Sequence, residues 1–142
     1  MRRERACQTR AQDGIEVNMA AVVAIALGGA AGSVLRYALA SWITYFARLG
    51  GSGTFVVNIA GAFGLGVFFG ILEARYPSIP PVIRLGVATG IFGGFTTFSS
   101  FMADVVTHAE AGRLPIAIAL FAATRILGII AMVGGLAIGR AA

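Results

Sequence analysis

Charged residues are scarce in this chain. Only 12% of its 142 residues are charged, whereas 58% are hydrophobic and the mean hydropathy is +0.86. Soluble domains carry about twice that share of charge. A chain this short cannot hide so many apolar side chains from water by folding on itself. The composition therefore predicts a protein whose solvent is the lipid bilayer.

The side chains of catalytic and metal sites are also nearly missing. One cysteine, Cys7, excludes an internal disulfide, and the one histidine, His108, excludes a Cys/His metal cluster. A lone histidine near a helix end is usually a solvated surface group. Outside the N-terminal tail the acids are Glu73, Asp104 and Glu110, which we expect at or beyond helix ends. No Ser-His-Asp set can be built from these residues, so we do not expect an enzyme.

Lysine is absent, and all 11 basic residues are arginines. Four of them fall in the first ten residues and the others are scattered, whereas nucleic-acid binding needs a clustered basic face. Nucleic acid is therefore not an expected partner. Residues 1–18 are polar, and we interpret them as a disordered tail or a misassigned start before Met19, rather than a targeting peptide. Residues 19–142 then form a single four-helix domain.

Four apolar segments follow the tail. Each is close to the ~20 residues that cross a ~30 Å hydrocarbon core. Because backbone groups in lipid must pair internally, we expect helices, and hence an all-α membrane protein. The segments run from Met19 to about Ala40, from about Gly53 to Leu72, from Pro80-Pro81 to about Ala103, and from about Leu114 to Ile138.

Glycines recur at four-residue spacing in these segments, which lets helix backbones approach closely. The pairs are Gly28/Gly32, Gly66/Gly70, Gly86/Gly90, Gly90/Gly94 and Gly135/Gly139.

Leaving out the tail and Arg125, which lies within the fourth segment, the arginines divide evenly between the two membrane sides. The positive-inside rule then has little to act on, so the chain could insert in both orientations and pair head to tail. The tail arginines would bias the termini towards the cytoplasm. The two groups are Arg75, Arg84 and Arg140 on the side of the termini, and Arg48, Arg113 and the nearby Arg36 on the other.

The third segment contains an unusual stretch, GGFTTFSSF, from Gly93 to Phe101. Two adjacent glycines weaken a helix. Four hydroxyl residues follow within five positions, and such side chains can bond backbone groups that a break leaves free. Freed carbonyls can coordinate a small hard cation. The alternative is an unbroken helix with local serine back-bonding.

The polar groups at membrane depth favour an anion. No carboxylate lies inside the segments, so proton-coupled cation export has no coupling group. Asn58 offers either an interhelical hydrogen bond or a donor lining a polar path. Hydroxyl donors, the positive edges of Phe98 and Phe101, and the charges of Arg36 and Arg125 suit a small, strongly hydrated anion. These residues do not say which anion.

Several stretches carry a family pattern. They read GGAAGSVLRY (Gly28 to Tyr37), GTFVVNIAGAFGLG (Gly53 to Gly66) and IRLGVATGIFGGFTTFSSF (Ile83 to Phe101), followed by the glycine-containing fourth helix. From Met19 to Gly139 the chain resembles the Fluc/CrcB fluoride channels. The resemblance implies a fluoride-specific channel of the cell inner membrane that reduces fluoride toxicity by passive export.

The resemblance also implies an assembly and a set of site residues. Family members are antiparallel, dual-topology homodimers with two fluoride pores and a central structural sodium ion. The backbone oxygens of Gly93 and Thr96 from both subunits would coordinate sodium at the two-fold axis. The residues implied for the fluoride path are the pore phenylalanines Phe98 and Phe101, the pore asparagine Asn58, the hydroxyl pair Ser99 and Ser100, and Arg36 near the aqueous entrance.

The fourth helix departs from the family pattern. Where members often show tyrosine and serine, this chain reads Phe121-Ala-Ala-Thr124-Arg125. Thr124 could keep a hydroxyl, and Arg125 could line the pore, snorkel or pair with a carbonyl.

Two other classes fit four short helices less well. A small multidrug exporter resembles a proton exchanger with a glutamate in its first helix, and the segment from Met19 to Ala40 has no acid. A non-transporting scaffold would use the glycine spacings but leave the hydroxyl-rich break unexplained. The fluoride channel is the preferred hypothesis.

Overall fold

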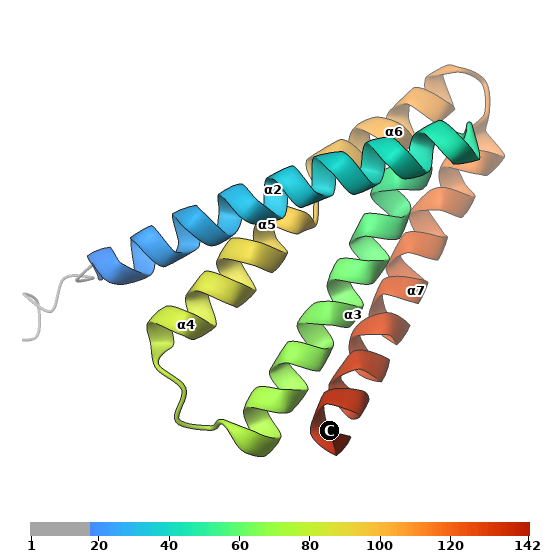
Figure 1. Ribbon diagram of the computed structural model, residues 1–142. Helices are drawn as coiled ribbons and strands as arrows, with labels where there is room; N and C mark the ends of the chain where they lie inside the picture. Colours follow the sequence, from blue (N-terminus) through green and yellow to red (C-terminus); the bar gives the residue numbers. More distant parts are fainter. Residues whose placement is uncertain (1–17) are drawn as a thin grey trace, which may run out of the picture.

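The regular structure of residues 18–142, the part that the computed structural model describes, is entirely helical. Four helical segments there are long and apolar enough to cross a membrane: Met19–Ala47, Ser52–Arg75, Pro81–Glu110 and Leu114–Ala141. The first, second and fourth are the single helices α2, α3 and α7 (Figure 1). The expected four-helix membrane fold is confirmed. The polar tail, apart from Asn18, lies outside the described residues.

The segments are longer than we expected from the sequence. Helix α2 continues to Ala47 rather than Ala40, because Trp42, Tyr45 and Phe46 extend it with side chains suited to the membrane interface. The third segment continues to Glu110 rather than Ala103.

Asp104 consequently lies inside a helix, and its expected place at a helix end was wrong. The Thr54 hydroxyl of α3 lies 2.5 Å from the Asp104 carboxylate and donates to it, which gives the charge a polar partner on a neighbouring helix.

The third segment is built from four pieces. These are α4 (Pro81–Leu85), the π-helix η1 (Gly86–Phe92), α5 (Gly93–Phe95) and α6 (Ser99–Glu110). Between α5 and α6 the chain is extended at Thr96, with φ −85° and ψ 158°. The predicted break is confirmed, and an unbroken helix is excluded. The π-helix was not predicted; such turns occur frequently at functional sites.

Helices α3 and α7 pack in parallel through their glycines, side by side in Figure 1. A Cβ at Gly66 or Gly70 would overlap a backbone carbonyl of α7, and one at Gly135 or Gly139 would overlap a carbonyl of α3. The two four-residue spacings therefore face each other and let the backbones touch.

A second parallel pair joins α2 to the first half of the third segment. A Cβ at Gly28 would overlap the Gly86 carbonyl, and one at Gly32 would overlap the Ile91 carbonyl. Gly94 of α5 meets the Gly29 carbonyl in the same way. These glycines bring the stretch before the break, from Gly86 to Phe95, into direct contact with the α2 backbone.

The α3–α7 contact yields a stability prediction. Gly135→Ala places a methyl group against the Phe63 carbonyl and should lower the free energy of unfolding by about 1–3 kcal/mol, the usual cost of overpacking. The measurement is denaturation of the purified protein in detergent micelles. Gly134→Ala is the matched control, because a Cβ at Gly134 meets nothing within 4 Å. Equal effects of the two substitutions would contradict the glycine contact.

Candidate functional site

The break in the third segment is held by one side chain of α3. The Thr97 backbone N–H donates to Asn58 Oδ1 at 2.8 Å, and Asn58 Nδ2 donates to the Thr97 carbonyl at 3.0 Å. The amide group therefore pairs with both polar groups of one backbone residue, as a neighbouring peptide would. Of the two alternatives for Asn58, the interhelical hydrogen bond is present in the structure.

At the break, two backbone carbonyls lose the N–H donors that a regular helix would give them. In an unbroken helix the Thr97 N–H would return to the Gly93 carbonyl, and the Ser100 N–H to the Thr96 carbonyl. Here the first donates to Asn58 and the second to the Thr97 hydroxyl at 3.2 Å. The carbonyls of Gly93 and Thr96 therefore lack the N–H donors that a regular helix would provide. These are the two residues that the family resemblance assigns to sodium.

The Thr97 side chain starts the next helix. Its hydroxyl accepts from the Ser100 N–H and donates to the Ser100 hydroxyl at 3.0 Å, the arrangement of an N-terminal helix cap. Ser99 and Ser100 themselves are exposed.

A polar cavity of about 250 Å³ lies beside the break. It receives side chains from α3, the break, α6 and α7. Its lining residues are Asn58, Thr96, Thr97, Phe98, Phe101, Thr124 and Arg125. None of these is acidic.

Some of the predicted pore residues line this cavity and others do not. Asn58, Phe98 and Phe101 line it together. The two rings differ in exposure, since Phe98 is 65% exposed and Phe101 only 2%.

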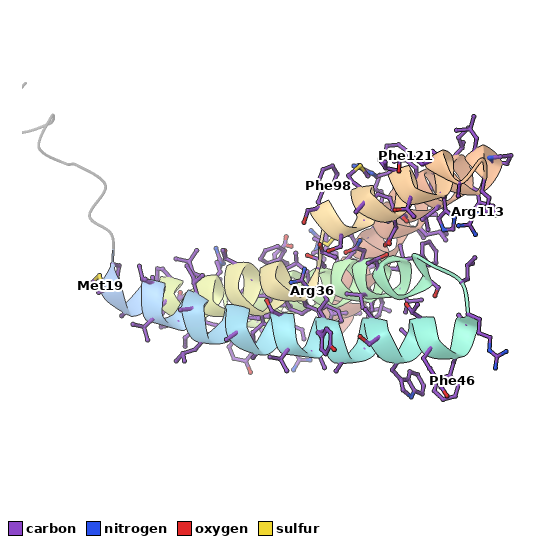
Figure 2. All side chains as sticks on the ribbon, turned by 90° about the horizontal axis from the view of Figure 1, so that it is seen from above. Met19, Arg36, Phe46, Phe98, Arg113 and Phe121 are labelled. Carbon is purple, nitrogen blue, oxygen red and sulfur yellow. The ribbon has the colours of Figure 1, made fainter. Side chains whose placement is uncertain are left out.

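The remaining predicted pore residues lie elsewhere. Ser99, Ser100 and Arg36 are not among the lining residues. Arg36 is half-buried on α2, one turn beyond Gly32. Figure 2 shows it on α2, whereas Phe98 and Phe121 lie on the side of the bundle away from α2.

The hydroxyl groups of the cavity already donate to protein oxygens. Thr96 donates to the Phe92 carbonyl at 2.9 Å, and Thr124 to the Leu120 carbonyl at 2.8 Å. The Thr97 proton goes to Ser100. The threonine donors that the sequence offered to an anion are therefore engaged within the chain, and the second N–H of Asn58 and the guanidinium of Arg125 are left.

Sequence reasoning left three alternatives open for Arg125, and it missed Phe121. The Arg125 guanidinium carbon lies 4.8 Å from the Phe121 ring centroid, 5.2 Å from that of Phe98 and 5.9 Å from that of Phe101. All three distances are within the range of cation–π attraction. The four-residue spacing of Phe121 and Arg125 on one helix was the available signal.

His108 is not the solvated group that its place near a helix end suggested. It is 3% exposed, and its Nε2 lies 2.8 Å from the Gly50 carbonyl. The reason is the extra length of α6, which carries His108 against the turn between α2 and α3. A separate, apolar cavity of about 460 Å³ adjoins it.

Comparisons with known proteins point to one family. Residues 23–136 match the sequence model of the family described as "CrcB-like protein, Camphor Resistance (CrcB)". The chain is 37% identical over 120 residues to the fluoride-specific ion channel FluC of Pseudomonas fluorescens (strain Pf0-1), covering 84% of this chain and 96% of that protein. It is 42% identical over 124 residues to the protein of the same name from Allorhizobium ampelinum, covering 84% and 95%.

The pairing of Asn58 with Thr97 can be tested by hydrogen exchange. Asn58→Leu removes both hydrogen bonds at similar volume, so amides from 93 to 101 should exchange at least about tenfold faster, as expected for a loss near 1.4 kcal/mol. Mass spectrometry of peptides from the protein in nanodiscs measures this. Ser33→Ala is the control, because that hydroxyl reaches the Gly94 carbonyl only at 3.5 Å. Unchanged exchange in Asn58→Leu would refute the pairing.

Proposed function

The chain belongs to the CrcB family, and on that premise we propose that it is a fluoride channel, through which fluoride leaves the cell passively. It is a multi-pass protein of the cell membrane and a channel rather than an enzyme. Its partners are the fluoride ion and the lipid bilayer. Passive export of this ion lowers its cytoplasmic concentration and its toxicity.

The observation that carries this function is the cavity beside the break. It combines an amide donor, two phenylalanine rings and one arginine, and no acid lines it. Fluoride is small and strongly hydrated, so each contact must replace part of its water shell, as carbonyls do for potassium. A unit positive charge at about 4 Å contributes about 4 kcal/mol at an effective dielectric constant of 20, which favours entry of an anion over a cation.

We extend the proposal to the assembly, an antiparallel homodimer with two pores. Arginines lie at both ends of the helices: Arg75, Arg84 and Arg140 at one end, and Arg48 and Arg113 at the other. Arg36 lies within α2 and counts for neither side. The two ends thus differ by a single arginine, and such a small charge difference supports insertion in both orientations. Phe98 and Gly93 are exposed in the single chain, which leaves surface beside the break for a second copy.

We also propose a structural sodium ion on the two-fold axis of that dimer. The carbonyls of Gly93 and Thr96 fit it, because their regular helical donors are redirected and hard cations prefer oxygen ligands. Two copies would supply four such oxygens. Residues 18–142 hold no cluster of three His, Cys, Asp or Glu side chains that would offer a rival metal site. The ion would join the two broken helices.

Fluoride passage is tested by efflux from liposomes that contain the purified protein. An ion-selective electrode should record rapid fluoride release on addition of a potassium ionophore. Chloride-loaded liposomes are the control, and their release should be at least about a hundredfold slower, because a site for a compact ion discriminates by ion size and hydration. Equal rates for the two ions, or no release of either, would rule out the proposed function.

The sodium proposal is tested by ion replacement. A ligand that binds only the folded dimer at 100 times its Kd stabilises it by about 2.7 kcal/mol. Thermal unfolding in sodium chloride should therefore occur several degrees higher than in choline chloride after extensive dialysis. Identical midpoints, with the protein sodium-free by elemental analysis in both, would argue against a structural sodium ion.

A further inference from the structure

We propose that Arg125 supplies the fixed positive charge of the fluoride path and sets its affinity for the ion, an inference that rests on the proposed function. Arg125 lies on α7 and lines the same cavity as Asn58, Phe98 and Phe101. It is the only charged residue that lines this cavity. The sequence alone left its place open between the pore, the membrane surface and a carbonyl partner.

Three aromatic rings hold the guanidinium in place. Phe121 belongs to α7 itself, one turn before Arg125, whereas Phe101 lies in the first turn of α6 and Phe98 immediately precedes that helix. Phe101 and Phe121 are also stacked on each other, with centroids 6.2 Å apart and planes 19° apart. The three ring contacts bridge the two helices and keep the flexible arginine side chain at the cavity wall.

No acid neutralises this charge within the described chain. The ion pair found among residues 18–142 joins Arg140 to Glu73 at the far end of α7. Arg125 contacts rings instead, and ring faces attract the cation without taking up its N–H donors. A guanidinium has five such donors in a planar fork, so it can present several N–H groups to a small anion.

The threonine hydroxyls of the cavity are already used within the chain, so Arg125 and Asn58 have the donors that remain for an anion. Thr96, Thr97 and Thr124 each donate to an oxygen of the chain. Asn58 already uses one of its two N–H donors on Thr97. The largest reserve of donors, and the only net charge, therefore belongs to Arg125.

The ring contacts also suit anion binding at the ring edges. A phenylalanine ring has a negative face and a positive edge. With the guanidinium near the ring centroids of Phe98 and Phe101, an anion beside it meets positive charge from the arginine and from the nearby ring edges. The cation and the anion would thus use different parts of the same rings.

The test compares fluoride currents of the unchanged protein and of four variants in planar bilayers, over a range of fluoride concentrations. Arg125→Gln removes the charge and keeps much of the length, so the half-saturating fluoride concentration should rise at least about tenfold. Arg125→Lys keeps the charge and loses the planar fork, and its value should lie between those of Arg125→Gln and the unchanged protein. Phe121→Leu keeps Arg125 but removes its nearest ring, and should raise the value about threefold.

Arg113→Gln is the matched control. Arg113 is exposed at the start of α7, beside the loop between α6 and α7 and far from Phe98 (Figure 2). The same charge change there should alter the half-saturating fluoride concentration by less than about twofold. A wild-type value in Arg125→Gln would overturn the inference. A larger current in that variant would also overturn it, because Arg125 would then obstruct the path.

Two further outcomes keep the conclusions separate. If the unchanged protein carries no fluoride current, the proposed function fails, whatever the variants do. If Arg125→Gln does not purify as a single species, Phe121→Leu decides, and an unchanged half-saturating concentration in that variant would overturn the role of Arg125.

Discussion

A helix can be interrupted inside a membrane only if other groups satisfy its backbone, and in this protein the Asn58 side chain does so. Its amide pairs with the N–H and the carbonyl of Thr97, and lipid could offer neither bond. The interruption has several consequences. It redirects the regular donors of Gly93 and Thr96, it lets the Thr97 hydroxyl cap α6, and it brings Phe98 into the cavity wall.

Glycine contacts give this pairing a rigid frame. Helix α3, which carries Asn58, is in backbone contact with α7, and the stretch before the break is in backbone contact with α2. Both contacts depend on the absence of Cβ atoms, since hydrophobic burial drives little association between helices in lipid. The same frame places Arg125 of α7 opposite the rings of Phe98 and Phe101, so the charge and the break share one cavity.

The sequence anticipated the parts of this structure that depend on local chemistry. Hydropathy indicated four helices, and two glycines followed by four hydroxyl residues indicated the break. Helix ends were misjudged because aromatic residues of α2, and α6 beyond Asp104, stay helical past the apolar core. The burial of His108 depends on that extra length. Two three-dimensional facts could not be predicted from the sequence. One is the oxygen to which each threonine hydroxyl donates, and the other is that Phe98, Phe101 and Phe121 all contact Arg125.

The most direct measurement is the dipolar coupling between the Asn58 side-chain carbonyl carbon and the Thr97 amide nitrogen, by solid-state NMR of the selectively labelled protein in lipid bilayers. A hydrogen bond of 2.8 Å from that nitrogen to Asn58 Oδ1 predicts a clear coupling between the two labels. No coupling there, together with a coupling between the Thr97 nitrogen and the Gly93 carbonyl carbon typical of an unbroken helix, would contradict the central role of Asn58.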